Sequence, residues 1–177
     1  MGTDAPGYAA GSMKKKIISA CVLGCFVLGA SVFAADDTDL SALPQVYRNA
    51  QLITLDKQNV AKGNGTLYGK FSFTRDTAAP EQAIKEIGWM TLQKGDSIGL
   101  HMHGVNEDAY IIISGEGVFT DGSGKETIVR GGDITIARPG QSHALRNEKE
   151  EPLVFLDVIA QNDTYQQTRP QPAAKQA

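Results

Sequence analysis

The chain has 177 residues, of which 17 are basic and 20 acidic, giving a formal net charge of −3, and 41% of its residues are hydrophobic. This size is enough for one packed domain and too small for two full ones. The slight acidic excess gives no indication of the basic surface that binding to nucleic acid or to an anionic membrane requires, and we expect neither as a partner.

The first recognisable segment is a secretory signal peptide, which we place at residues 13–34. Three lysines at 14–16 form its basic region, residues 17–33 are an apolar run, and the small residues Val32 and Ala34 mark a cleavage site. The pattern predicts cleavage near Ala34 and a periplasmic or secreted protein. Residues 1–12 lack this charge pattern and are interpreted as an upstream leader, native or otherwise, so that residues 1–34 do not belong to the fold.

Two other interpretations of this segment concern the membrane. A permanent anchor needs about 20 apolar residues, and the run at 17–33 is shorter, so we expect no stable membrane insertion after cleavage. The tetrapeptide VLGC at 22–25 resembles a lipoprotein cleavage box, but apolar residues continue beyond Cys25. Cys21 and Cys25 are the only cysteines, so the chain from residue 35 on contains no thiol that could form a disulfide.

The remaining chain divides into three parts. Residues 35–50 are polar and mixed, and we interpret them as an N-terminal arm. Residues 51–161 form the predicted domain. Residues 162–177 are rich in Gln, Pro and Ala, which is typical of a flexible C-terminal tail with little apolar surface to bury.

The domain reads as short β-like runs separated by turn residues, which predicts an all-β sandwich or small barrel. One short helix is expected at 79–86. The predicted strands are QLITL (51–55), TLYGKFSFT (66–74), IKEIGWMTL (84–92), DAYIIIS (108–114), GVFTD (117–121), ETIVR (126–130), GDITIAR (132–138) and EPLVFLDVIA (151–160).

All three histidines of the chain lie in this domain. His101 and His103 are two residues apart, so in a strand both imidazoles point to one face and Met102 points to the other. His143 follows a tight turn and begins another strand. Antiparallel pairing of the two segments would bring the three rings together, and imidazole suits Fe, Zn, Cu and Ni.

At these residues the chain resembles the cupin superfamily. Its first motif is a glycine, five residues, H-x-H, three or four residues, an acid, six residues and a glycine. Here Gly95 is followed by DSIGL, HMH, the acids at 107 and 108, and Gly115.

The second cupin motif is a glycine, five residues, P-x-G, two residues, a histidine, three residues and an asparagine. Here Gly132 is followed by DITIA, RPG, QS, His143, ALR and Asn147. Arg138 stands where the motif has proline. Both motifs occur in order within residues 85–160, and the resemblance implies a single-domain double-stranded β-helix, or jelly-roll barrel, with a metal inside one open end.

The motifs leave the acid ligand open. Spacing to Gly115 favours Asp108, reach favours Glu107, and adjacent strand residues face opposite sides, so at most one of the two points inward without a bulge. A site of three histidines and water is a further alternative. The resemblance implies one divalent transition metal (Fe, Mn, Ni or Zn) at His101, His103 and His143 with Asp108 or Glu107.

Other residues near the predicted barrel mouth are candidates for a substrate pocket: Trp89, Tyr110, Arg138 and Gln141. Core packing is the competing role for the two aromatic residues, and a solvated loop is the competing role for the other two. Proton transfer would fall to Glu107, Tyr110 or metal-bound water. We assign no catalytic residue from the sequence, and Asn147 is interpreted as a turn residue.

Three functions are compatible with the resemblance, because the cupin fold hosts many activities. We favour an exported metalloenzyme of the oxygenase, lyase or isomerase type acting on a small polar organic molecule. The alternatives are a module that binds a small ligand without turnover and a barrel with a structural metal. Small cupins often dimerise, so a homodimer is expected.

Overall fold

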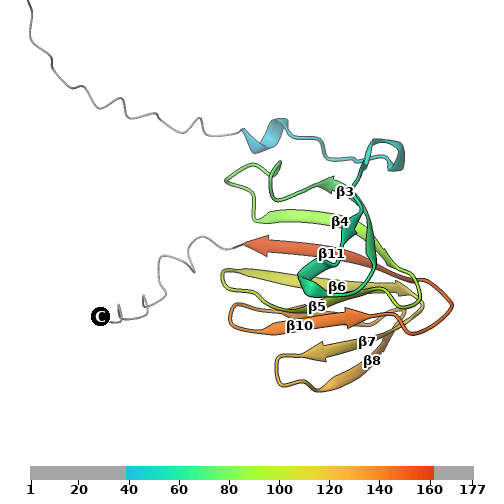
Figure 1. Cartoon of the computed structure of the whole chain (residues 1–177). Coiled ribbons are helices and arrows are strands. Elements are labelled where there is room, and N and C mark those ends of the chain that lie inside the picture. The colour runs from blue at the N-terminus through green and yellow to red at the C-terminus, as the bar shows by residue number, and fades with distance from the viewer. Residues whose placement is uncertain (1–38, 162–177) are drawn as a thin grey trace, which may run out of the picture. The chain divides into compact units, whose positions relative to one another are not determined.

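The structure is a computed structural model that describes residues 39–161, and these residues form an all-β barrel of two antiparallel sheets (Figure 1). The larger sheet has the order β1-β3-β4-β11-β6-β9, with β2 also paired to β3, and the smaller sheet has the order β5-β10-β7-β8. The predicted all-β jelly-roll fold is confirmed. The predicted leader and signal (1–34) and the tail (162–177) lie outside the described residues, as do residues 35–38 of the arm.

The strands alternate with tight turns and three 3-10 turns along the chain. The 3-10 turns are η1 (Leu40–Ala42), η2 (Asn49–Gln51) and η3 (Val60–Lys62). The strands are β1 (Ile53–Thr54), β2 (Lys57–Gln58), β3 (Thr66–Phe73), β4 (Ile84–Leu92), β5 (Ser97–Met102), β6 (Asn106–Ser114), β7 (Glu116–Asp121), β8 (Glu126–Arg130), β9 (Ile134–Ala137), β10 (Ser142–Arg146) and β11 (Leu153–Gln161).

Strand β11 organises the larger sheet, because it lies between β4 and β6 and pairs with both over most of its length. Its buried residues alternate with outward ones, as a period of two requires. Phe155 pairs with Met90 on one side and with Ile112 on the other, and all three are buried. This row forms part of the apolar core.

Polar residues replace apolar ones farther along the same inner face. Asp157 pairs with Tyr110, and the next inward position, Ile159, pairs with both Asp108 and Glu86. The side chains of Asp108, Asp157 and Glu86 are all buried. One end of the barrel interior is therefore hydrophobic and the other carries ionisable groups.

The smaller sheet is built around the antiparallel pairing of β5 with β10, in which His101 faces His143 and Met102 faces Ser142. The predicted pairing of these two segments is confirmed. Ile98 pairs with Leu145, so β5 holds one more residue than β10 between the two paired positions. This β-bulge allows Ile98 and His101, which differ in parity, to face the interior together.

The segment predicted to be helical at 79–86 has a different structure, and that prediction is wrong. Residues 80 and 81 form a turn, and β4 begins at Ile84. The Gln82 side chain accepts a hydrogen bond from the Ala79 backbone N–H and donates one to the Ile84 carbonyl. These local bonds satisfy backbone groups that a helix would have used.

The described part of the arm, residues 39–50, is exposed and reaches the barrel through an edge contact between the rings of Tyr47 and Phe73, 5.8 Å apart. Asn147 serves the turn role expected of it: its amide donates to the carbonyls of Leu92 and Glu151, and its oxygen accepts from the Lys149 N–H. No helix within residues 39–161 is long and apolar enough to cross a membrane.

Candidate metal centre

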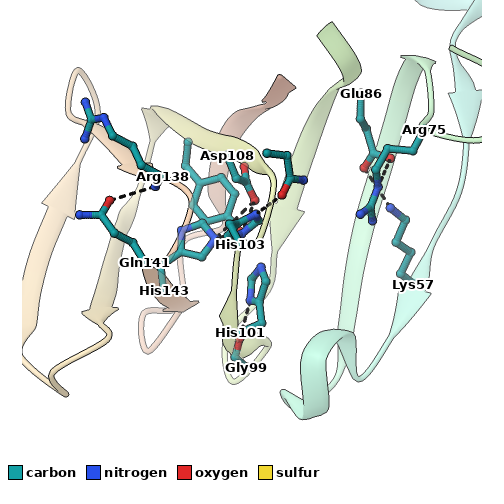
Figure 2. Close-up of polar contacts among 12 residues, drawn as sticks. Lys57, Arg75, Glu86, Gly99, His101, His103, Asp108, Arg138, Gln141 and His143 are labelled. Carbon is teal, nitrogen blue, oxygen red and sulfur yellow. Dashed lines mark hydrogen bonds and ion pairs between the residues drawn. The ribbon is translucent and has the colours of Figure 1, made fainter. Parts of the chain in front are cut away.

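Three imidazoles come together on the inner face of the smaller sheet (Figure 2). His101 lies on β5, His103 directly follows that strand, and His143 lies on β10. Their ring centroids are 4.7 to 4.8 Å apart in every pairing. Met102 points outward and is 68% exposed, so the i, i+2 pattern places both neighbouring rings on the inner face as expected.

Asp108 joins the imidazoles from β6 in the opposite sheet. Its Oδ2 lies 3.4 Å from Nε2 of His103 and 3.4 Å from Nε2 of His143. Glu107, the alternative acid, is exposed and belongs to the outward set of the β6 alternation. The structure therefore brings Asp108 to the three histidines and leaves Glu107 outside the cluster.

Backbone and side-chain acceptors fix the orientation of two of the rings. Nδ1 of His101 is 2.9 Å from the Gly99 carbonyl oxygen, and Nδ1 of His103 is 3.2 Å from Oδ1 of Asn106. Because both partners are acceptors, each Nδ1 carries the proton and each Nε2 keeps its lone pair. Such contacts are typical of histidines that bind metals. Sequence reasoning did not identify Gly99 or Asn106, although Asn106 follows His103 by three residues.

The third ring is delivered by the turn before β10. Gly140 has a φ of 89°, a left-handed conformation that favours glycine, and its N–H donates to the His103 carbonyl at 2.7 Å. The His103 N–H in turn donates to the Gln141 carbonyl at 3.0 Å. This pair of bonds joins the two histidine segments of the chain.

The electrostatic environment favours neutral imidazoles beside an ionised carboxylate. Burial lowers the pKa values of His101 and His103, although the Gly99 carbonyl and the Asp108 charge act in the opposite direction. Burial alone would raise the pKa of Asp108, but its hydrogen bonds with His143 and Asp157 outweigh burial and the pKa lies below its usual value. Neutral imidazole and ionised carboxylate are the forms that bind metals.

Asp157 is a buried acid that sequence reasoning missed. Burial, followed by the charge of Asp108, raises the pKa of Asp157 well above its usual range. Asp157 therefore holds a proton more readily than Asp108 does. The signal was present in the sequence, because this acid interrupts the apolar run LVFLDVIA.

Of the four substrate-pocket candidates, Tyr110 alone lies within the cluster. Its ring stacks on His143 at a centroid distance of 4.7 Å, and its hydroxyl is 3.3 Å from His143 Nε2. Trp89 is 46% exposed and lies on the outer face of β4, because that strand turns Gly88 and Met90 inward. Trp89 is thus placed away from the histidines.

The two remaining candidates lie in the turn between β9 and β10. The Gln141 side-chain oxygen accepts a hydrogen bond from the Arg138 backbone N–H at 2.9 Å, so it closes the turn (Figure 2). Arg138 itself is exposed to solvent. The geometry thus gives Gln141 a structural role and leaves Arg138 at the surface.

The cluster fits a divalent transition-metal ion. His101, His103, Asp108 and His143 each offer one ligand atom, and these atoms lie within 4.8 Å of one another. Nε2 of His103 and Nε2 of His143 are 3.0 Å apart, close to the separation of about 3 Å for two nitrogens bound at right angles to one ion. Oδ1 of Asp108 is buried without a hydrogen-bond partner. Three imidazoles with one carboxylate suit Fe, Mn, Ni or Zn.

The fold and this cluster define a cupin, and the chain belongs to the cupin superfamily: residues 88–159 match the cupin domain family. The chain is 41% identical over 114 residues to an oxalate-binding protein of Thermotoga maritima, covering 64% of this chain and 92% of that protein.

The solved structures that share the fold include the following two. A predicted oxalate decarboxylase from Thermotoga maritima is 30% identical, with a TM-score of 0.60 over 66% of this chain and 99% of that one. An uncharacterized conserved protein with a double-stranded β-helix domain from Klebsiella pneumoniae is 25% identical, with a TM-score of 0.51 over 68% of this chain and 93% of that one.

The adjacent acids provide a matched test of the ligand set. Asp108→Asn is expected to weaken divalent-metal binding by roughly tenfold or more, because it removes a ligand charge from the cluster. Glu107→Gln is expected to leave affinity within about twofold, since its side chain faces outward. Titration calorimetry of Mn²⁺ or Zn²⁺ into chelator-stripped protein measures both. Equal effects of the two substitutions would show that Asp108 is not a ligand.

Proposed function

We propose that this protein is an exported cupin that binds a small carboxylate of the oxalate class through a divalent transition-metal ion. The ion would be held by His101, His103, Asp108 and His143. The observation that carries the proposal is the convergence of these four side chains, three of them buried, in a chain that is 41% identical to an oxalate-binding protein.

The ion's contribution would be that of a Lewis acid with coordination positions open to a carboxylate oxygen. The protein's own contribution is to favour the neutral form of His101 and His103 and to orient these two rings. Gly99 and Asn106 accept the Nδ1 protons, and the core encloses His143 completely. The coordination chemistry of three imidazoles and a carboxylate favours a ligand with hard, anionic oxygens.

Positive charges nearby also favour an anionic ligand. Lys57 Nζ lies 3.1 Å from Glu86 Oε1, and Arg75 Nε lies 3.8 Å from Glu86 Oε2 (Figure 2). Glu86 and Asp108 pair with the same residue of β11, so this group lies at the same level of the barrel as the histidines. Lys57 and Arg75 are thus two cations near the site, and both contact the Glu86 carboxylate.

Oxalate binding is expected to require the metal. We expect near-stoichiometric Fe, Mn, Ni or Zn in protein purified without chelator or affinity nickel, and its loss in His143→Ala. Titration calorimetry should show oxalate binding to the metal-loaded protein, with affinity falling by roughly tenfold or more after chelation. Glu107→Gln serves as the matched control.

Two results would contradict the proposal at different points. A protein that takes up none of these four metals would remove the metal centre itself. A protein that takes up metal but does not bind oxalate would keep the metal centre and remove the ligand class.

A second candidate function is decarboxylation of oxalate, favoured by the position of Tyr110. Burial, then the charges of Asp108 and Asp157, raises the pKa of Tyr110 well above 10, so its hydroxyl keeps a proton 3.3 Å from His143. Breaking the carbon–carbon bond of oxalate releases carbon dioxide, and one proton taken up by the remaining carbon gives formate. Tyr110 is positioned to supply that proton, which the overall reaction consumes from solvent.

Tyr110→Phe separates turnover from binding, because phenylalanine keeps the stacking on His143 and removes only the hydroxyl. We expect formate production from oxalate to fall by roughly a hundredfold, with oxalate affinity within about twofold of wild type. Formate is measured in a stopped assay, and affinity by calorimetry. If wild type releases no formate, the binding function alone remains; if the variant is equally active, Tyr110 is not the proton donor.

Export and dimerisation complete the proposal. The basic and apolar segments of residues 13–34 support export, and the apolar outer face of the larger sheet, with exposed Trp89, Ile113 and Ile134, supports a homodimer. Protein recovered from the extracytoplasmic fraction should begin at or near Ala35 by N-terminal sequencing.

Light scattering should give twice the mass of the processed chain. An unprocessed N-terminus or a monomeric mass would contradict the respective part.

A further inference from the structure

Residues 59–63, which we call the strap, have an unusual backbone. Asn59, Ala61 and Lys62 have φ values of 48°, 52° and 64°, the left-handed region that non-glycine residues rarely occupy. Such conformations cost free energy and persist only where the surrounding structure holds them. The strap connects β2 to β3, and Val60 and Ala61 pack against the core.

The strap presses its backbone directly against β5. A Cβ added at Gly99 would lie 2.2 Å from the Ala61 carbonyl oxygen and 2.8 Å from the Gly63 nitrogen. The contact is mutual, since a Cβ at Gly63 would lie 2.2 Å from the Ser97 carbonyl oxygen. Only two glycines allow the two backbones to come this close.

Hydrogen bonds fasten the same contact just beyond the strap. The Ser97 N–H donates to the Asn64 carbonyl at 2.8 Å, and the Asn64 N–H donates to the Ser97 hydroxyl oxygen at 2.8 Å. Gly99 is therefore held by a segment about forty residues earlier in the chain.

Gly99 also lies in the β-bulge of β5, where the alternation of inward and outward side chains is interrupted. The β-bulge lies between Ile98 and His101, whose partners on β10 are Leu145 and His143. Without the extra residue, Ile98 and His101 would face opposite sides of the sheet. The Gly99 carbonyl then accepts the Nδ1 proton of His101 at 2.9 Å, so one residue both permits the inward turn and orients the ring.

We propose that the strap is a positioning element for the metal centre: it holds Gly99 in the bulge and thereby aims His101 at the cluster. Gly99 is a positioning residue that acts through His101. The inference rests on the metal-binding part of the proposed function and is independent of the ligand and of any turnover.

The test is a double-mutant cycle of Gly99→Ala with His101→Ala, read as the affinity of chelator-stripped protein for Mn²⁺ and, separately, for Zn²⁺. Gly99→Ala is expected to weaken binding by roughly tenfold or more, as the loss of a contact that orients a ligand does. In the His101→Ala background the same substitution should change affinity by less than about twofold, because its effect passes through the missing ring.

Gly104→Ala is the matched control, since Gly104 lies just beyond His103 and a Cβ there would meet no atom within 4 Å. It should bind metal as wild type does. Folding of each variant is checked by circular dichroism and thermal unfolding. Should Gly99→Ala not fold, Ser97→Ala takes its place in the cycle, because it removes the hydroxyl that accepts from Asn64 and leaves Gly99 intact.

Each possible outcome of the double-mutant cycle either supports or overturns the positioning role of the strap. Wild-type affinity in the substituted protein would overturn the proposal, as would an equal loss with and without His101, which would mean that the strap supports the barrel as a whole. Failure of the wild-type protein to bind either metal would overturn the metal centre and this inference together. Metal binding that falls only where His101 is present would support the positioning role.

Discussion

The antiparallel pairing of β5 with β10 is the constraint on which the candidate site depends. It sets His101 opposite His143, and the period of two along β5 adds His103 to the same face. The larger sheet then needs to supply only one more side chain, Asp108, from the facing strand. The site is therefore a product of strand register, and a shift of one residue would turn two of the imidazoles toward solvent.

Charge at the site is arranged in layers along the barrel interior. The row formed by Met90, Phe155 and Ile112 is apolar, and the following positions of β11 introduce Asp157 and then the level of Asp108 and Glu86. Burying several acids together is costly unless they differ in protonation or contact cations. Both solutions occur here: the pKa values of Asp157 and Asp108 are shifted in opposite directions, and Glu86 contacts Lys57 and Arg75.

The sequence predicted much of this arrangement because its signals are local. Two histidines at i, i+2 and the tight turn before His143 are properties of short segments, and both held in the structure. Adjacent acids in one strand cannot face the same side, so the choice between Asp108 and Glu107 depended on which of the two faces the interior. That direction is set by the pairing of β6 with β11, which local spacing does not determine.

The features that the sequence did not predict depend on contacts distant in the chain. Trp89 was considered for the pocket, but the register of β4 against β11 turns Gly88 inward instead. Asp157 meets Asp108 only because β11 lies beside β6. The close approach of the strap to Gly99 leaves no pattern in composition or hydropathy, since it depends on two backbones meeting without side chains. In place of the expected helix at 79–86 the chain forms a turn, in which the Gln82 side chain bonds to the backbone of Ala79 and Ile84.

The ligand cluster draws on both sheets, and this has a consequence for the stability of the folded chain. In an unfolded chain His101 and His143 are separated by some forty residues, and only folding brings them together. An ion bound to them and to Asp108 would act as a removable cross-link whose stabilisation of the folded state rises with the logarithm of the free ion concentration. Both cysteines lie before residue 35, so the domain forms no disulfide of its own. Its resistance to unfolding would then vary with the metal supply of the compartment.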